Sequence, residues 1–472
     1  MLLVHGGNSP AALLATSLAT SSPSTSASAS PSASVAKTKV VWNTAFGAGG
    51  APSQVKAEQA FVDRYNATNS DGIELSLQWW LPDCASCNFD TFLAQGGASD
   101  IIGPIDIQGR VGLHKYVLGL NDLIAENHTD LGSFPPALLA TFKNAVGQYE
   151  GLPYDEFPAF IFYNKDLFKT AGLPNLPTQV GQKYMGQDWT WDELATIAKQ
   201  LTVDVNYRKS TDAGFSPSQV RTYGFDAQWV NDLRRFATPW GAGSYVATDG
   251  KTAQMPAVWD QAWKWYYDAM WTSHFAPTNA ERSAADMGTG TTVATGRVAT
   301  DLAWSWAISS FGTSTASGAP ASRFAHWDMG VLPSNDGATT DPIDTDTFVI
   351  ANYSKVPEAA YKAMLAIMAD PALIAIYGGM PVDQSMQAAY FKTLQAAVDA
   401  QFPDNPVTWS VLTEMAKYAA SPTHQDPFPN YVRGTTDDQA FYTRLQTKGG
   451  LNLNSEIAKF KGKLQADFNS TG

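Results

Sequence analysis

The chain has 472 residues and a formal net charge of −13 at pH 7. Because one hydrophobic core rarely serves more than about 250 to 300 residues, this length predicts two lobes. The negative charge argues against a nucleic-acid partner, since phosphates are neutralised by Lys and Arg. No window holds the roughly 18 uninterrupted apolar residues of a membrane span.

The first 36 residues differ in composition from the rest. A short apolar segment at the start has no Lys or Arg before Lys37, whereas a secretory signal begins with positive charge. Residues 21–34, SSPSTSASASPSAS, predict a flexible tether. We therefore expect residues 1–36 to be an export segment and disordered tether of a protein held outside the cell membrane, although the Cys that would carry a lipid is missing upstream of the tether.

The folded part begins with alternating strands and helices. Three apolar stretches are predicted as strands: 37–46, 73–80 and 100–105. Between the first two, Phe61, Val62 and Tyr65 share one face of a predicted helix. This order of strand, helix and strand is typical of a parallel sheet covered by helices.

The cysteines, Cys84 and Cys87, occur in the segment PDCASC. We favour a local disulfide that closes a surface loop, which is consistent with an oxidising compartment. Two alternatives stay open. A zinc half-site would need a second pair of ligands, and a redox centre would need a helix start within a βαβ unit.

The rest of the chain continues the alternation. A buried strand is predicted at 160–163, and Thr190 to Glu193 form a capping box that starts a helix. Aromatic residues from Trp259 to Tyr267 repeat at helical spacing, which indicates a core face rather than a ligand surface. The remaining elements are strands at 296–306 and 345–352, a helix behind Pro357, and a helix from Asp370 to Gly378.

Several sequence pieces occur in an order that resembles a known family. The stretch GLPYDEFPAFIFYNKDLFKTAGLP is followed by TWDELATIAKQL, and ASDIIGP, GRVATDLAWSW, GVLPSNDG and DTFVIANYSKVPEAAYKAMLAIMADPALIAIYGG take their places around them. Together these pieces are similar to the extracellular solute-binding proteins of sugar ABC transporters, the maltose-binding-protein-like family. The resemblance runs from about residue 37 to the C-terminus.

The resemblance implies a fold and a function. The expected fold is α/β and two-lobed, each lobe a mostly parallel sheet with flanking helices, joined by a hinge of several strands around a ligand cleft. By analogy, lobe one would hold residues 37–153 and 298–353, and lobe two residues 154–297 and 354–472. The implied function is extracytoplasmic capture of a mono- or oligosaccharide by a monomer without cofactor, metal or catalysis. The sugar would pass to the permease of an ABC importer.

Sugar recognition combines flat aromatic faces for C–H surfaces with charged acceptors for hydroxyls. Hydrogen bonds to charged groups contribute about 1.5 to 3 kcal/mol, against about 1 for neutral ones. The predicted ligand-binding residues are aromatic side chains in loops or at strand ends, and carboxylates near the cleft: Trp42, Asp106, Asp155, Glu156, Asp226, Trp229, Trp240, Trp304, Trp306, Asp346, Trp409 and Tyr431. Asp344 lies in the same run as Asp346 and is considered with it. Of Trp304 and Trp306, we expect one to stack on the ligand and the other to pack nearby. For each carboxylate, a turn cap or a solvated charge is the alternative.

Other functions stay open. A glycoside hydrolase needs two carboxylates about 5 to 9.5 Å apart, whereas Asp155 and Glu156 are neighbours that a strand directs to opposite faces. A cationic ligand such as a polyamine, or a peptide, would also suit an acidic and aromatic cleft. A structural adhesin would need no cleft at all.

Overall fold

The computed structural model describes residues 36–44, 48–79, 89–94, 97, 99–144, 146–287, 292–310 and 326–470. The chain divides into residues 1–36 and a compact unit of residues 37–472. The predicted disulfide between Cys84 and Cys87 lies outside the described residues, as does the predicted tether apart from Ala36.

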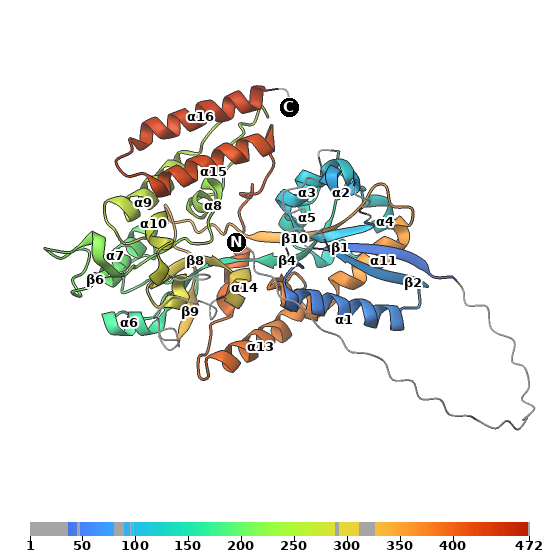
Figure 1. Cartoon of the computed structure of the whole chain (residues 1–472), viewed down its shortest axis with the longest axis horizontal. Coiled ribbons are helices and arrows are strands. Elements are labelled where there is room, and N and C mark those ends of the chain that lie inside the picture. Colours follow the sequence, from blue (N-terminus) through green and yellow to red (C-terminus); the bar gives the residue numbers. More distant parts are fainter. Residues whose placement is uncertain are drawn as a thin grey trace, which may run out of the picture. The chain divides into compact units, whose positions relative to one another are not determined.

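A six-stranded sheet organises the first part of the compact unit, in the order β11-β4-β10-β3-β1-β2 (Figure 1). Its strands are β1 (Thr38–Thr44), β2 (Ile73–Trp79), β3 (Ile101–Asp106), β4 (Leu152–Phe157), β10 (Asp344–Ile350) and β11 (Met380–Pro381). Strand β1 pairs in parallel with β2 and β3, while β10 runs antiparallel to β3 and β4. The three strands predicted at the start of the chain are confirmed, and so is their parallel pairing.

Helices cover this sheet because each has one apolar face. They are α1 (Pro52–Thr68), α2 (Phe89–Ala94), α3 (Ile107–Leu113), α4 (Asn121–Glu126), α5 (Pro136–Thr141), α11 (Pro357–Met368) and α12 (Pro371–Tyr377). Phe61, Val62 and Tyr65 of α1 are buried against the sheet, as their spacing predicts. Proline occupies the first turn of α1, α11 and α12, where no intrahelical donor is needed.

A three-stranded sheet, in the order β8-β5-β9, organises the second part. Its strands are β5 (Ala159–Asn164), β8 (Thr300–Trp304) and β9 (Trp327–Gly330), and a separate pair is formed by β6 (Val203–Asp204) and β7 (Val220–Thr222). Strand β5 runs antiparallel to both neighbours, although isolated parallel bridges join residues 223 and 226 to the β8 side. The second sheet thus differs from the mostly parallel one expected, because a buried apolar run carries no signal of strand direction.

The second sheet is also covered by helices. They are α6 (Lys165–Ala171), α7 (Trp191–Leu201), α8 (Leu233–Ala237), α9 (Ala257–Trp271), α10 (Asn279–Arg282), α13 (Gln384–Gln401), α14 (Ser410–Met415), α15 (Tyr431–Thr447) and α16 (Leu453–Asn469). Trp259, Trp263 and Tyr266 of α9 are buried, which confirms that the aromatic repeat is a core face. Within the described residues, no single helix is long and apolar enough to cross a membrane; the bent pair α11 and α12 meets the criterion by composition, and both helices contribute to the core of the first sheet.

The chain passes from one sheet to the other at Pro158, the residue between β4 and β5. The carboxyl-terminal half of β4 carries Asp155 and Glu156. Strand β10 lies beside β4 in the same sheet, and its first residues pair with the end of β4. This crossing therefore brings the last residues of β4 and the first residues of β10 close to the second sheet.

Candidate functional site

Asp344, the first residue of β10, is the centre of a polar cluster. Its carboxylate lies 3.2 Å from Nη1 of Arg235 and 3.0 Å from Nε2 of His424, and it accepts a 3.3 Å hydrogen bond from Nε1 of Trp306. Burial opposes ionisation, but these three neighbours outweigh it and lower the pKa of Asp344. The carboxylate is therefore an ionised acceptor that ties three distant segments together.

An aromatic stack lies beside this carboxylate. The guanidinium of Arg235 lies 5.0 Å from the ring centre of Trp304, and Trp304 stacks on Trp306 with centres 6.1 Å apart and planes 10° from parallel. Trp229 meets Trp306 edge-on at 5.2 Å. Trp304 is fully buried and donates to the carbonyl of Pro342, whereas Trp306 and Trp229 keep part of their surface exposed. Trp306 is therefore the member of the predicted pair that can meet a ligand.

Three aspartates form a row across neighbouring strands of the first sheet. Asp346 of β10 is the direct partner of Asp106 on β3 and of Asp155 on β4. Asp106 accepts from the backbone of Gly109 at 2.6 Å and from Nε2 of Gln425 at 3.2 Å. Asp155 accepts from the backbone of Asp346 at 3.3 Å. Burial raises the pKa of all three carboxyl groups.

Glu156 is buried next to Asp155 on β4, and its direct partners across the sheet are Thr345 and Met380. Successive strand residues point to opposite faces, so Glu156 does not extend the aspartate row. Burial raises the pKa of Glu156 to about 8. Its side chain therefore stays protonated at neutral pH.

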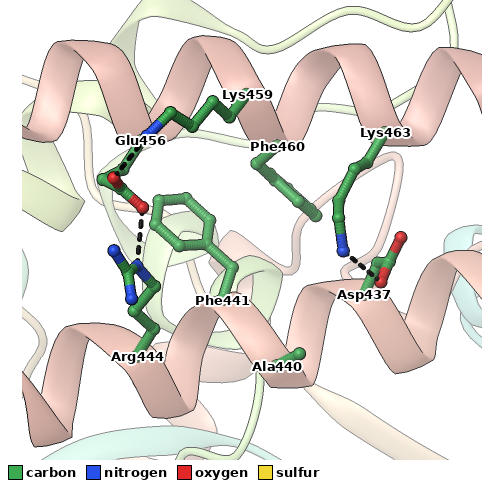
Figure 2. A pocket seen from close by; sticks show the side chains of 8 residues that line it. All are labelled: Asp437, Ala440, Phe441, Arg444, Glu456, Lys459, Phe460 and Lys463. Atoms are coloured by element: carbon green, nitrogen blue, oxygen red, sulfur yellow. Dashed lines mark hydrogen bonds and ion pairs between the residues drawn. The ribbon is translucent and has the colours of Figure 1, made fainter.

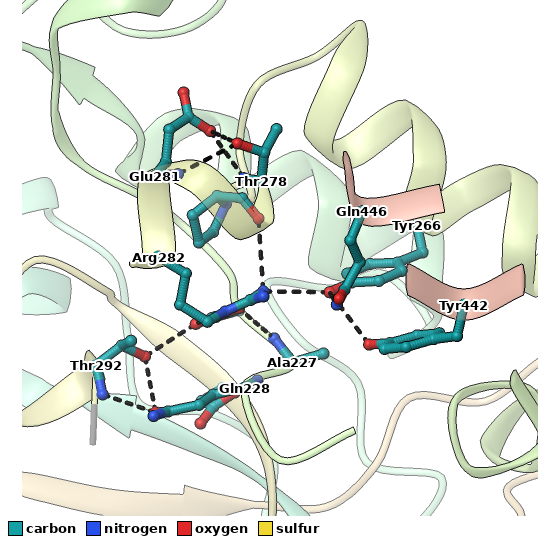
Figure 3. Close-up of polar contacts among 12 residues, drawn as sticks. Ala227, Gln228, Tyr266, Thr278, Glu281, Arg282, Thr292, Tyr442 and Gln446 are labelled. Atoms are coloured by element: carbon teal, nitrogen blue, oxygen red, sulfur yellow. Dashed lines mark hydrogen bonds and ion pairs between the residues drawn. The ribbon is translucent and has the colours of Figure 1, made fainter. Parts of the chain in front are cut away.

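Asp226 is part of the scaffold that holds the segment before Trp229. Its partners Arg282 and Thr292, and the nearby Gln228, are labelled in Figure 3. Arg282 donates to its carboxylate through Nε at 3.1 Å and Nη2 at 2.5 Å, and Thr292 donates through Oγ1 at 2.9 Å. Thr292 also donates from its backbone to Oε1 of Gln228 at 2.7 Å. These contacts fix the segment from Asp226 to Gln228, and so the position of Trp229, the next residue.

Two predicted tryptophans lie in hydrophobic packing rather than in the cluster. Trp42 is fully buried in the core of the first sheet and donates to the carbonyl of Gly103 at 2.8 Å. Trp240 is buried and stacks on Trp191, with centres 5.1 Å apart and planes 13° from parallel. Neither indole face is presented to the Asp344 cluster.

The last two predicted aromatic residues differ in position. Trp409 donates to Oε1 of Gln395 at 2.9 Å, and its ring packs on Trp327 and Phe391. The hydroxyl of Tyr431 contacts Nη2 of Arg234, the residue before Arg235, at 3.4 Å. Burial raises the pKa of Tyr431, and the charge of Arg234 opposes this effect only in part.

Arg235, His424 and Gln425 are cluster residues that the sequence did not reveal. Arg235 lies in a short helix, and His424 and Gln425 follow a Ser-Pro pair in a segment without periodicity. The residue types Arg, His and Gln do not by themselves indicate that these three positions belong to a binding site. Asp344 was visible in the same run as Asp346, but it was not included in the predicted set.

Buried polar atoms without a hydrogen-bond partner gather around the cluster. Among the described residues, none contacts Nε1 of Trp229, Nε of Arg235, Oδ2 of Asp155 or Oε1 of Gln425 at hydrogen-bond geometry. An unsatisfied buried polar atom costs about 1 to 3 kcal/mol. Both donors and acceptors are present, so a hydroxyl-bearing ligand, which offers both, would satisfy them.

A separate groove lies between α15 and α16 (Figure 2). Phe441 and Phe460 line it, and ion pairs border it: Glu456 contacts Arg444 at 2.6 Å and Lys459 at 3.0 Å, and Asp437 contacts Lys463 at 3.0 Å. Because each of these charges already has a partner, the groove offers no unpaired group to a ligand. No group of three or more His, Cys, Asp or Glu arranged to hold a metal occurs in the described part of the chain.

The family model for bacterial extracellular solute-binding proteins matches residues 50–372. The chain belongs to this family. The two-lobed α/β fold predicted from the sequence is thereby confirmed. The family indicates that this solute-binding protein is extracytoplasmic, and its members and the similar structures are binding proteins rather than enzymes.

Solved structures of sugar-binding proteins resemble this solute-binding protein in fold. An ABC substrate-binding protein from Listeria monocytogenes in complex with cycloalternan is 18% identical, with a TM-score of 0.65, over 92% of this chain and 100% of that one. The sugar-binding protein MalE from Xanthomonas citri is 16% identical, with a TM-score of 0.64, over 91% and 97%. The cyclic α-maltosyl-1,6-maltose binding protein from Arthrobacter globiformis is 16% identical, with a TM-score of 0.64, over 92% and 99%. No curated protein sequence matches the chain.

Proposed function

We propose that this solute-binding protein captures a carbohydrate at the Asp344 cluster and releases it unchanged to the permease of an ABC importer. The observation that carries the proposal is the partly exposed indole of Trp306 beside an ionised carboxylate and several unpartnered buried donors and acceptors. An indole face suits the C–H surface of a pyranose, and the polar atoms suit its hydroxyls. Similar structures that hold cycloalternan and α-D-tagatose support a carbohydrate.

The proposed site lies between two lobes, 37–153 with 298–353 and 154–297 with 354–472. The passage of the chain from β4 through Pro158 to β5 would serve as one hinge connection. A ligand that contacts both lobes favours the closed form by its differential affinity for that form. In this proposal the protein acts as a monomer, held at the cell surface through the N-terminal tether, and it performs no catalysis.

We expect one carbohydrate from a panel of mono- and oligosaccharides to raise the melting temperature, because a ligand that binds only the folded state stabilises it. Chromatography should recover that carbohydrate chemically unchanged. A cleaved product would instead support a glycoside hydrolase.

Replacing Trp306 with Ala should weaken binding of that carbohydrate about tenfold or more. Aromatic contacts contribute about 0.5 to 1.5 kcal/mol beyond the area they bury, and 1.4 kcal/mol corresponds to tenfold in affinity. Trp409→Ala is the matched control, since it removes another partly buried indole outside the cluster. Calorimetry that finds equal losses in the two variants would contradict the site.

A further inference from the structure

Building on the proposed function, we propose that the captured sugar carries a protonated amino group, which binds to the row of Asp106, Asp346 and Asp155. The row lies across β3, β10 and β4, with Asp346 directly opposite each of the other two. Side chains directly opposite one another in an antiparallel pair have Cβ atoms about 4.5 to 5.5 Å apart, and like charges there are destabilising. A row of three aspartates is therefore stabilised by protons or by a cationic partner.

Unused acceptor atoms point to a ligand at this row. In the part of the chain that the structure describes, no group donates a hydrogen bond to the carboxylate of Asp346. Oδ2 of Asp155 is buried without a partner, and so is Oε1 of Gln425, a neutral side chain whose amide nitrogen already holds Asp106. An ammonium group has three donors and no acceptor, so it complements a site that offers acceptors.

The positive charges near the row are already engaged elsewhere. Arg235 and His424 both contact Asp344, and their effect on Asp106 is smaller than the effect of its burial. For Asp155 and Asp346, the other charged groups that act on them are carboxyl groups. The row thus has three carboxyl groups without a cation of their own.

An organic ammonium fits the row better than a metal ion does. Calcium takes six to eight oxygen ligands at about 2.3 to 2.6 Å, and no metal-holding group of His, Cys, Asp or Glu occurs among the described residues. Carboxyl groups spaced along neighbouring strands can instead contact one ammonium and the adjacent hydroxyls of a sugar ring. The stack that ends at Trp306 lies next to the start of the same strand, β10, through its bond to Asp344.

Binding of an ammonium changes the protonation of the row in a measurable way. Burial raises the pKa of all three aspartates, and that of Asp155 to about 8, so the ligand-free row holds at least one proton at neutral pH. An ammonium favours the ionised form of a carboxyl group that it contacts. Each carboxyl that ionises releases one proton to the buffer, while the ammonium keeps its own protons and donates hydrogen bonds to the carboxylate. A neutral sugar leaves this proton balance unchanged.

The test is isothermal titration calorimetry with chain-matched sugars on the full chain. The probes are glucosamine and its β-1,4-linked dimer and tetramer, beside glucose, cellobiose and cellotetraose. We expect an amino sugar to bind at least about tenfold more tightly than its neutral counterpart. At a pH at which the free amino sugar is already protonated, the binding heat should differ between two buffers of unlike ionisation enthalpy, which reports the protons that the row releases.

Asp346→Asn should abolish the preference for the amino sugar, whereas Asp122→Asn, which removes an exposed charge from α4, should keep it. Equal or tighter binding of the neutral sugar, or a buffer-independent heat in the wild type, would overturn the amino-sugar assignment and leave carbohydrate capture standing. The calorimetry of the wild type decides this even if Asp346→Asn does not fold. If the protein binds spermidine but none of the sugars tested, carbohydrate capture itself is overturned.

Discussion

Replacing Arg282 with Met is expected to lower the free energy of unfolding by about 3 to 5 kcal/mol, the usual cost of leaving a buried charge without its partner. Asp226 is fully buried, and Arg282 holds it through two nitrogens. Its neighbour Asp301 is also buried, and both burial and the charge of Asp226 raise the pKa of Asp301. Without Arg282, this pair of carboxyl groups has lost its cation. Urea denaturation followed by circular dichroism measures the change.

Two further variants sharpen this prediction. Lys183→Met removes the cation of an ion pair with Asp188 in which both side chains are largely exposed, so its cost should stay below about 1 kcal/mol. Asp226→Asn combined with Arg282→Met should recover much of the loss, because it removes the buried charge as well as its partner. If the double variant is no more stable than Arg282→Met, the unpaired carboxylate is not the cause of the loss.

The strands and helices that the sequence predicts could be placed because each one buries a continuous apolar face. The strand at 160–163 and the helix after Thr190 could be placed from spacing and capping alone, and β5 and α7 lie there. The direction of β5 relative to its neighbours could not be placed in this way. It depends on partners at β8 and β9, which are more than 130 residues further along the chain, and local periodicity does not record them.

The proposed site also contains residues that the sequence predicts and residues that it does not. Trp306 and Asp346 belong to residue types that suit a sugar site, and both lie at or beside the cluster. Trp240 has the same residue type, yet it packs on Trp191. Side chains from distant segments pack on a tryptophan and decide its environment. The sequence around the tryptophan does not predict which side chains these are.

The cluster residues that sequence reasoning missed meet their partners across long chain separations. Gln425 reaches Asp106 over 319 positions, and Arg235 reaches Asp344 over 109. Neither contact has a spacing rule, since loop segments carry no regular period. Polar residues that matter only through such a meeting require the fold before they can be identified.

Replacing Glu156 with Gln is expected to remove one contribution to the pH dependence of stability. Burial raises the pKa of Glu156 from 4.5 to about 8, a change that corresponds to roughly 4 to 5 kcal/mol at most. The folded state holds this proton more tightly than the unfolded state does. The contribution of Glu156 to the free energy of unfolding is therefore complete below about pH 4.5 and is lost as the pH rises to about 8. Above that pH, both states are ionised and the loss is complete.

The difference in unfolding free energy between Glu156→Gln and the wild type isolates this group, because the neighbouring buried carboxyl groups titrate in both proteins. The difference should grow in favour of the variant from about pH 4.5 to pH 8 and then level off. Glu126→Gln, at an exposed position on α4, is the matched control and should follow the wild type within a few tenths of a kcal/mol, as exposed substitutions do. If the difference in unfolding free energy between Glu156→Gln and the wild type stays constant from about pH 4.5 to pH 8, Glu156 is ionised in the folded protein. Its charge would then need a cationic or water partner at the end of β4, and water would reach the side chain at the crossing between the two sheets.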